Sequence, residues 1–341
     1  MKAAVLREGG HVRVEDVPDP EPGGRQVVLR VIYCGICGSD LHALRAGGLA
    51  EGAILGHEIV GEITALGPGV RGFEVGDRVT TLSAVPCDQC DRCEAGMFRT
   101  CRNGWQIFGY TGVPGGYAEL LLTHSSIIEK VPDETTDIVA AFNEPAIVGV
   151  HAVRISRMRP GDTAVIIGAG PIGLLVLQAA RLTNPGPIFV VEPSVGRRQV
   201  AMKLGATACF DPFNDDVAGF LLRETDVGPD VVFECAGARG TLQSAIEWVR
   251  PGGQVMVPGV NMEDDEISPL AMVGKECEIV GSLGGGELFA DVLGMLSRGL
   301  IDVEPMVSRI VSLHELDAVL QELGTPECDD IKVLVAPGQD G

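Results

Sequence analysis

The stretch that decides the fold runs from Thr163 to Ala180 and reads TAVIIGAGPIGLLVLQAA. It is apolar enough to resemble a membrane span, but three glycines and a proline interrupt it. Ala164–Ile167 predicts a buried strand, and the residues after the glycines predict a helix. A strand that leads through G-x-G-x-x-G into a helix is the context that dinucleotide binding requires. We therefore interpret this stretch as a strand, a tight turn and a helix.

Each position of the turn Gly168-Ala-Gly170-Pro171-Ile172-Gly173 has a role in the predicted site. Gly168 permits the tight turn, Gly170 lets the backbone approach a pyrophosphate, and Gly173 allows the helix to pack closely on the strand. Pro171 and Ile172 open the helix, whose first N–H groups face the phosphates.

The next predicted strand, Ile188–Val191, ends at Glu192, about 20 residues after the turn. A carboxylate there can accept hydrogen bonds from both ribose hydroxyls and would repel a 2′-phosphate, so we expect NAD rather than NADP. Arg197 and Arg198 follow closely. They could weaken this preference, or they could be exposed charges on the following helix.

The pattern around this stretch divides the chain. From about residue 154, apolar strands alternate with helical segments, which predicts a doubly wound parallel sheet. The first 150 residues carry short Val/Ile/Leu runs broken by Gly and Pro, as in a partly open β-barrel. The predicted strands are 27–33, 59–66, 77–82, 118–122, 164–168, 188–191, 208–210, 231–235, 253–257, one near 310, and 332–335; the predicted helices are 171–183, 196–204, 240–249, 288–298 and 313–323.

Four cysteines, Cys87, Cys90, Cys93 and Cys101, lie close together in the sequence. Four thiolates at such spacing can converge on one ion if a compact lobe, about residues 86–104, folds around it. Zn²⁺ fits four sulfurs in a closed, structural site. The alternative is a disulfide cluster, which suits an oxidising compartment.

Composition limits the classes of function. The chain has 341 residues, 45% hydrophobic and 21% charged, which predicts a globular protein of about two domains. The formal net charge of −21, from 47 acidic and 26 basic residues, argues against binding to nucleic acid or to anionic membranes. The N-terminal segment lacks the features of a signal peptide, so we expect a cytoplasmic protein whose ten cysteines bind metal before they form disulfides.

A second set of metal-type residues precedes and follows the cysteine lobe. Cys37 comes just after a predicted strand, the pair His57-Glu58 follows about twenty residues later, and Glu144 precedes Pro145. Thiolate, imidazole and carboxylate all bind Zn²⁺, and three protein ligands with an open fourth position are what catalytic zinc needs. Taken singly, Cys37 could fill the core, His57 could be a satisfied loop histidine, and both glutamates could belong to ion pairs.

In combination these motifs resemble the zinc-dependent medium-chain dehydrogenase/reductase family, within it the branch of sorbitol, butanediol and threonine dehydrogenases. The resemblance covers essentially the whole chain. The motifs that carry it are Gly56-His57-Glu58 with Gly61, Gly76-Asp77-Arg78-Val79, the cysteine lobe, Glu144-Pro145 with His151-Ala-Val, Asp230-Val-Val-Phe-Glu-Cys-Ala-Gly237 and Arg250-Pro-Gly-Gly253.

The resemblance implies a domain plan. Residues 1–153 would form a GroES-like catalytic domain that contains the cysteine lobe. Residues 154–288 would form a Rossmann NAD-binding domain, and residues 289–341 would return to the catalytic domain. It also implies a homodimer or homotetramer.

The resemblance further implies roles for site residues. Cys37, His57 and the carboxylates Glu58 and Glu144 match the catalytic zinc shell, in which one glutamate is a ligand while the other, or a water, holds the remaining place. The sequence leaves open which glutamate is the ligand.

The proton path is implied in the same way. Ser39 and His42 match the proton relay of alcohol dehydrogenases, which passes the alcohol's proton through the ribose of the cofactor. Asp40 matches the carboxylate that orients a ligand histidine, here His57. His42 could also be a surface histidine on a short helix.

The expected protein is thus an enzyme with one catalytic and one structural zinc ion, transferring a hydride between NAD and a small-molecule secondary alcohol. A polyol, sugar alcohol, aminocyclitol or vicinal diol is the expected substrate class. The alternatives are an NADPH-linked ketone reductase of a biosynthetic pathway and a redox-inactive binding protein of the same fold.

Overall fold

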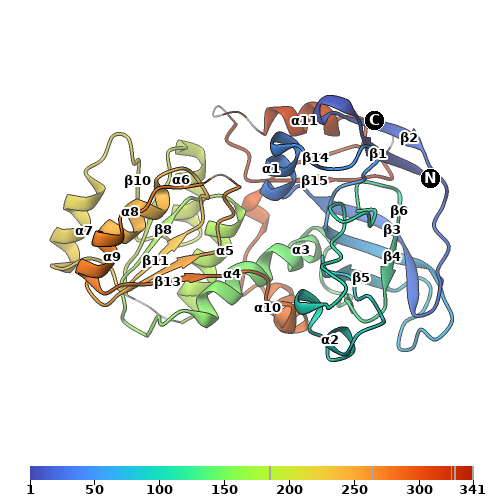
Figure 1. Cartoon of the computed structure of the whole chain (residues 1–341), viewed down its shortest axis with the longest axis horizontal. Coiled ribbons are helices and arrows are strands. Elements are labelled where there is room, and N and C mark those ends of the chain that lie inside the picture. The colour runs from blue at the N-terminus through green and yellow to red at the C-terminus, as the bar shows by residue number, and fades with distance from the viewer. Residues whose placement is uncertain (184–185, 263, 324, 326–327, 340–341) are drawn as a thin grey trace. The chain divides into compact units, whose positions relative to one another are not determined.

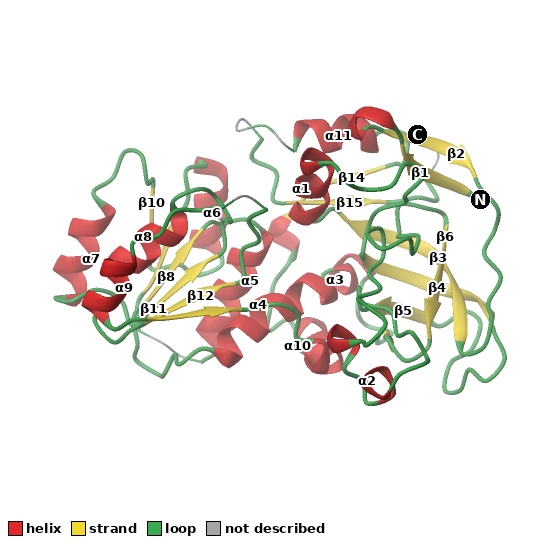
Figure 2. Cartoon of the chain, viewed as in Figure 1, coloured by secondary structure: helices red, strands yellow, loops and turns green. Residues whose placement is uncertain are grey.

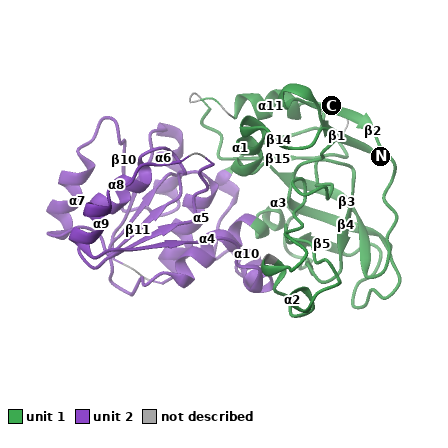
Figure 3. Ribbon diagram, in the orientation of Figure 1, with its two compact units in different colours: residues 1–144, 307–341 green, residues 145–306 purple. Residues whose placement is uncertain are grey.

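The computed structural model describes residues 1–183, 186–262, 264–323, 325 and 328–339. The chain forms two compact units (Figure 3): unit 1 comprises residues 1–144 and 307–341, and unit 2 comprises residues 145–306. The boundaries expected from the sequence were 153/154 and 288/289. By this division helix α10 (Phe289–Ser297) belongs to unit 2 and helix α4 (Asn143–Ile155) begins at the boundary.

Unit 2 is built on a six-stranded parallel sheet with helices packed around it (Figures 1 and 2). The strand order is β10-β9-β8-β11-β12-β13, so the sheet grows outward in both directions from β8 and β11. This is the order 3-2-1-4-5-6 of a doubly wound dinucleotide-binding sheet, and the predicted Rossmann fold is confirmed. Its strands are β8 (Ala164–Ile167), β9 (Ile188–Val191), β10 (Ala208–Phe210), β11 (Val231–Glu234), β12 (Gln254–Val257) and β13 (Glu278–Gly281).

The strands of this sheet are short apolar runs because both of its faces are covered. All four residues of β8, of β9 and of β11 are buried. The sequence missed β13 and two helices, whose patterns are interrupted by charged or small residues. The helices of unit 2 are α5 (Pro171–Leu182), α6 (Val195–Lys203), α7 (Val217–Thr225), α8 (Thr241–Trp248), α9 (Pro269–Lys275) and α10, with the 3₁₀ helices η3 (Gly286–Leu288) and η4 (Glu304–Met306).

Unit 1 is built on a seven-stranded, mostly antiparallel sheet in the order β14-β15-β3-β4-β5-β7, with β6 paired to β3. A separate hairpin joins β1 and β2. The strands are β1 (Lys2–Leu6), β2 (Val12–Asp16), β3 (Gln26–Gly35), β4 (Glu58–Leu66), β5 (Arg78–Thr81), β6 (Leu120–His124), β7 (Ile128–Lys130), β14 (Val307–Val311) and β15 (Lys332–Val335).

The central pair of this sheet is β3 with β4, and two register shifts interrupt it, between Val28 and Leu29 and between Val31 and Tyr33. Such irregularities bend a strand and let a sheet curl toward a barrel. The parallel pair β14–β15 closes the sheet next to β3, although the whole of unit 2, residues 145–306, comes before β14 in the chain. The helices of unit 1 are α1 (Gly38–Ala46), α2 (Asp91–Glu94), α3 (Asp137–Ala141), the start of α4, and α11 (Leu316–Glu322), with the 3₁₀ helices η1 (Glu8–Gly10) and η2 (Phe98–Thr100).

The apolar stretch that resembles a membrane span is β8, the glycine turn and the twelve-residue helix α5. Among the described residues, no helix has the length and apolar character needed to cross a bilayer.

Candidate active site

The four cysteines of the lobe lie together in unit 1. Their Sγ atoms are all within 4.8 Å of one another, and those of Cys90 and Cys101 are 3.9 Å apart. Four sulfurs held about 2.3 Å from a zinc ion would be about 3.8 Å apart, so this arrangement fits the tetrahedral site predicted for the lobe. All ten cysteines of the chain are free, which disagrees with the disulfide alternative.

The local backbone favours the thiolate form of one of these cysteines, Cys90, whereas burial raises the pKa of Cys93 to about 12. Cys90 is the N-cap residue of helix α2, and its sulfur accepts a hydrogen bond from the N–H of Cys93 at 3.5 Å. Donation by the backbone N–H groups of Arg102 and Cys93 lowers the pKa of Cys90 to about 6. The thiolate, which is the form that binds zinc, is therefore favoured at neutral pH.

Helix α1 presents the predicted catalytic residues that lie near the N-terminus. Cys37 is its N-cap residue, and the carboxylate of Asp40 accepts the N–H of Cys37 at 3.3 Å. This contact joins the N-cap residue to the third residue of the helix and so stabilises the first turn of α1. The thiol of Cys37 is thereby fixed just after the end of β3. Ser39 and His42 are three residues apart on the helix and therefore share one face.

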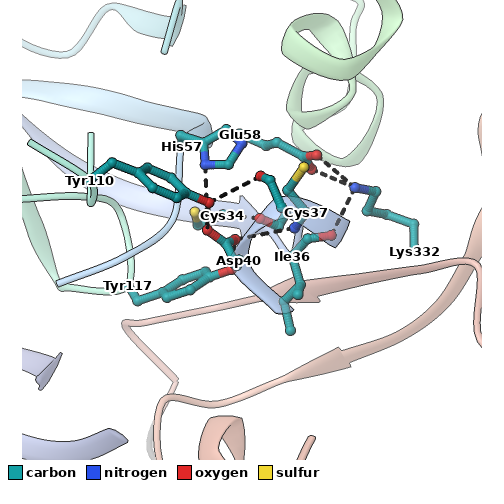
Figure 4. Close-up of polar contacts among 11 residues, drawn as sticks. Cys34, Ile36, Cys37, Asp40, His57, Glu58, Tyr110, Tyr117 and Lys332 are labelled. Atoms are coloured by element: carbon teal, nitrogen blue, oxygen red, sulfur yellow. Dashed lines mark hydrogen bonds and ion pairs between the residues drawn. The ribbon is translucent and has the colours of Figure 1, made fainter. Parts of the chain in front are cut away.

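Asp40 is fully buried and is the centre of a polar network (Figure 4). Its Oδ1 accepts the hydroxyl of Tyr110 at 2.8 Å, and its Oδ2 accepts the hydroxyl of Tyr117 at 2.7 Å. The Nδ1 of His57 lies 3.6 Å from Oδ1. Burial acts to raise the pKa of Asp40, but His57 and the two hydroxyl donors outweigh it and lower the pKa. An ionised carboxylate at this position is what a ligand histidine needs behind its ring.

His57 itself is buried between acidic groups. Burial acts to lower its pKa, but the nearby Asp40 and Cys37 outweigh this and raise it well above its ordinary value. The surroundings of the imidazole therefore favour positive charge at this point.

Glu58 has a partner that the sequence analysis did not identify. Its carboxylate lies 2.6 and 2.8 Å from the Nζ of Lys332, which also donates to the carbonyl oxygen of Ile36 at 2.9 Å (Figure 4). Both side chains are 2% exposed. Gly35 lies opposite Glu58 in the β3–β4 pair, and a Cβ at Gly35 would be 2.0 Å from the Glu58 carboxylate, so this carboxylate occupies the space that a side chain at position 35 would need.

Glu144 is buried at the start of helix α4, 8% exposed. Burial raises the pKa of its carboxyl group, while the charge of His57 and a hydrogen bond from Ser83 act in the opposite direction. Glu58 and Lys332 also act on it electrostatically, so Glu144 shares the polar interior of unit 1 with the other predicted ligands.

This interior contains more acidic than basic side chains. At full ionisation Cys37, Asp40, Glu58 and Glu144 would carry four negative charges, against which Lys332 and a protonated His57 supply two positive charges. Buried charges require partners, so the donor set fits a divalent cation. The ligand atoms are less tightly gathered than in the cysteine lobe: among the described residues, only the four cysteines form a set of three or more donors within 4.8 Å of one another.

The predicted dinucleotide turn connects β8 to α5 in unit 2. Gly168 has a φ of 97°, which favours glycine, and a Cβ on Gly173 would be 1.9 Å from the carbonyl oxygen of Gly168. By contrast, nothing lies within 4 Å of a Cβ on Gly170, the N-cap residue of α5. The turn is therefore tight where the helix meets the strand and open where a pyrophosphate would approach.

Glu192 lies beside this turn, 5% exposed. Its carboxylate accepts the N–H of Ala169 at 2.8 Å and the N–H of Ser194 at 2.9 Å. Arg198 donates to the carbonyl oxygens of Glu192 and Pro193 and lies 3.3 Å from Asp211, so its guanidinium is already used within the fold. Arg197 is the third residue of helix α6, and its N–H donates to the hydroxyl oxygen of Ser194, the N-cap residue of that helix, at 3.1 Å.

Sequence reasoning missed three residues of this site: Lys332, Tyr110 and Tyr117. A lysine inside the apolar run Ile331–Val335 is unusual for a buried strand and was a usable signal. No comparable signal marks the two tyrosines, which come from a loop and from the residues before β6. The chain has only three tyrosines, and two of them donate to Asp40.

Comparisons with known proteins agree with this architecture. The model of the alcohol dehydrogenase GroES-like domain matches residues 23–133, and that of the zinc-binding dehydrogenases matches residues 171–298. The chain is 31% identical to the sorbitol dehydrogenase of Bacillus subtilis strain 168, over 99% of this chain and 98% of that protein.

Two solved structures are similar over almost their whole length. One is the 2R,3R-butanediol dehydrogenase of Bacillus subtilis, with a TM-score of 0.88 and 30% identity, covering 99% of each chain. The other is a protein of Sinorhizobium meliloti 1021 assigned to the zinc-binding dehydrogenases and bound to NADP, with a TM-score of 0.90 and 32% identity, covering 98% of this chain and 99% of that one. The chain belongs to the zinc-dependent medium-chain dehydrogenase/reductase family of alcohol dehydrogenases. The expected family and fold class are thereby confirmed.

Proposed function

We propose that this protein oxidises a secondary alcohol, of the polyol or vicinal diol class, with NAD as hydride acceptor. The reaction converts the alcohol and NAD⁺ into a ketone, NADH and a proton. The observation that carries the proposal is the donor set of Cys37, His57 and Glu144, of which His57 and Glu144 are buried and Cys37 is partly exposed, in surroundings where acidic groups outnumber basic ones. Similarity to sorbitol and butanediol dehydrogenases supports the substrate class.

Cys37, His57 and Glu144 would hold the catalytic zinc ion, and the cysteine lobe would hold the structural one. Glu58 is the weaker ligand candidate because Lys332 already occupies its carboxylate at 2.6 and 2.8 Å. Lys332 acts on Glu144 electrostatically, but among the described residues no ion pair joins Glu144 to a lysine or arginine. Zinc, when bound, acts as a Lewis acid on the substrate oxygen, and nicotinamide accepts the hydride.

Side chains of the protein would then carry the proton of the alcohol away from the substrate. Asp40 holds the ring of His57, and Ser39 accepts the proton that the alcohol releases and passes its own on toward His42. The position of Ser39 and His42 on one face of α1 supports this direction of transfer.

Glu192 would bind the adenosine ribose. The carboxylate is held beside the turn by two backbone N–H groups, so it is pre-positioned to accept ribose hydroxyls. Arg198 is engaged with backbone carbonyl oxygens and Asp211, which leaves it poorly placed for a 2′-phosphate. These contacts support NAD over NADP, even though the Sinorhizobium meliloti relative was solved with NADP.

A screen of reduction of NAD⁺ and NADP⁺ with polyols, vicinal diols, aminocyclitols and simple secondary alcohols tests the proposal. We expect turnover with at least one polyol or diol, a kcat/KM at least about tenfold higher with NAD⁺, and two zinc ions per chain by elemental analysis. A preparation with full zinc that reduces neither cofactor would contradict the dehydrogenase assignment. A preference for NADPH and ketones would favour the reductase alternative.

We also propose that two copies of the chain associate through the edge of the unit 2 sheet. Strand β13 forms this edge, and the neighbouring helix α9 carries Leu270 and Val273, which are 79% and 73% exposed. An open strand edge beside exposed apolar side chains is a surface that pairs readily with a second copy about a two-fold axis.

Sedimentation velocity tests this association. We expect the wild-type protein to sediment as a dimer or as a multiple of dimers. The double variant L270E/V273E should shift toward the monomer, because charges would then be buried at the interface. A wild-type protein that remains monomeric at micromolar concentration would exclude the proposed interface.

A further inference from the structure

The side chain of Asp88, the residue that follows Cys87, connects the cysteine lobe to the sheet of unit 1. Its Oδ1 accepts a hydrogen bond from the Nη2 of Arg25 at 2.6 Å, and its Oδ2 lies 3.1 Å from the Nε2 of His124. Arg25 directly precedes strand β3, and His124 ends strand β6, which pairs with β3. One carboxylate thus joins the lobe to two neighbouring strands that are distant from it in the sequence.

The two partners of this carboxylate act differently. The side chain of His124 is 3% exposed, and burial lowers the pKa of its imidazole, so the ring is neutral at pH 7. Its Nδ1 accepts the N–H of Ser126 at 3.1 Å, which leaves the ring proton on Nε2, the nitrogen that faces Asp88. The Nε2 and Oδ2 atoms are not aligned as a hydrogen bond, so this contact is electrostatic. Arg25 supplies the aligned, charged hydrogen bond, which is the stronger kind.

The backbone of Asp88 is left-handed, with a φ of 55°. Residues other than glycine rarely adopt this conformation, although aspartate tolerates it better than most. On either side of this residue an N–H group points to a sulfur: the N–H of Gln89 donates to the Sγ of Cys87, and the N–H of Cys87 donates to the Sγ of Cys93, both at 3.4 Å. Donors of this kind orient a metal ligand from behind. The turn at residues 87–89 therefore supports two of the four sulfurs.

We infer that Asp88 is a positioning residue that anchors the cysteine lobe to the sheet of unit 1 and thereby holds the N–H groups of the 87–89 turn against the zinc-binding sulfurs. A strained backbone conformation persists only where surrounding contacts hold it, and for Asp88 those contacts come from outside the lobe. The inference rests on the structural zinc ion proposed for the lobe and not on the alcohol oxidation. Asp88 is not itself a ligand in this account.

Asp91 is the matched control. It follows Cys90 as Asp88 follows Cys87, and it also pairs with an arginine, since the Nε of Arg102 donates to its Oδ1 at 2.5 Å. However, both members of this pair belong to the lobe, and their side chains are 62% and 61% exposed. Replacing Asp91 with asparagine therefore removes an ion pair of the lobe without detaching the lobe from the sheet.

The experiment compares the rate at which excess chelator removes zinc from the full-length wild-type protein and from D88G, R25Q and D91N. Thiol titration of the same samples identifies the lobe ion, because its loss exposes four cysteines together. For D88G we expect release about tenfold faster than from the wild type, although glycine relieves the strain at this φ. R25Q removes the anchor without changing the lobe and should be faster by a similar factor. D91N should differ from the wild type by less than about twofold.

A double variant and a spectrum complete the test. D88G/R25Q should release zinc within about twofold of D88G, since both changes remove the same anchor. With cobalt(II) in the lobe, the thiolate-to-metal absorption should shift in D88G and R25Q but not in D91N, because it depends on how the sulfurs surround the ion.

Three results would overturn the inference: release from D88G as slow as from the wild type, effects of D88G and R25Q that multiply, or equal acceleration in D91N and D88G. If zinc release from the wild-type protein never exposes four thiols together, the proposed structural zinc ion itself fails, and this outcome is separate from any result with the variants.

Discussion

Replacing Cys37 with alanine is expected to lower kcat/KM by at least about a thousandfold and to reduce the zinc content from two ions to one per chain. The thiolate is one of three proposed ligands, and it is held in place as the N-cap of helix α1. A bound metal ion stabilises developing charge by several kcal/mol, and a loss of about 4 kcal/mol corresponds to a thousandfold in rate. Steady-state kinetics and elemental analysis of the same sample measure both effects.

Cys34 provides the matched control for this experiment. It is a fully buried cysteine three residues earlier, on strand β3, and it is not among the proposed ligands. C34A should keep two zinc ions and most of the activity. Two zinc ions in C37A, or undiminished turnover, would contradict the assignment of Cys37 to the catalytic metal.

Replacing Lys332 with methionine is expected to destabilise unit 1 by about 3 to 5 kcal/mol, because the carboxylate of Glu58 would be left buried and unpaired. Both partners are 2% exposed, so solvent cannot take over the role of the ammonium group. The double variant E58Q/K332M should recover most of this loss, since neither side chain is then charged. Urea denaturation with zinc present measures the free energy of unfolding.

The chain offers a clean readout and a control for this measurement. Trp105 lies in unit 1 and Trp248 in unit 2, so in a W248F background tryptophan fluorescence follows unit 1 alone. The pair Lys130–Asp77 is equally short, at 2.7 Å, but its side chains are 48% and 22% exposed, and K130M should cost less than about 1 kcal/mol. Equal losses of unfolding free energy in K332M and K130M would show that burial does not strengthen the contribution of the Lys332–Glu58 ion pair to stability.

Parts of the fold and of the site could be predicted because they are local in sequence. The cysteine lobe is defined within fifteen residues, and its four sulfurs do converge. The strand, the glycine turn and the helix from Ala164 to Leu182 are contiguous, and β9 and β10 have the predicted bounds. In both cases the residues are so close in the sequence that their spacing along the chain largely determines their positions in the folded protein.

Other features could not be predicted, because they depend on contacts between distant segments. The ion pair of Glu58 and Lys332 joins residues 274 positions apart, and it exists only because β15 closes the sheet beside β3. The predicted ligand set left Glu58 and Glu144 equivalent, and this ion pair is the physical difference between them. Strand β13 and helices α7 and α9 were missed because they are short, with 4, 9 and 7 residues, and elements of this length are stabilised mainly by packing on the sheet.

The sequence by itself determined the family, the doubly wound sheet and the residue types available for metal and nucleotide, because glycine turns and clustered cysteines specify short-range geometry. Only the tertiary structure decided that Lys332 neutralises Glu58 and that Tyr110 and Tyr117 both converge on Asp40. The reason is that a buried carboxylate must find its donors wherever the folded chain brings them, and nothing in the local sequence specifies which distant loop will supply them.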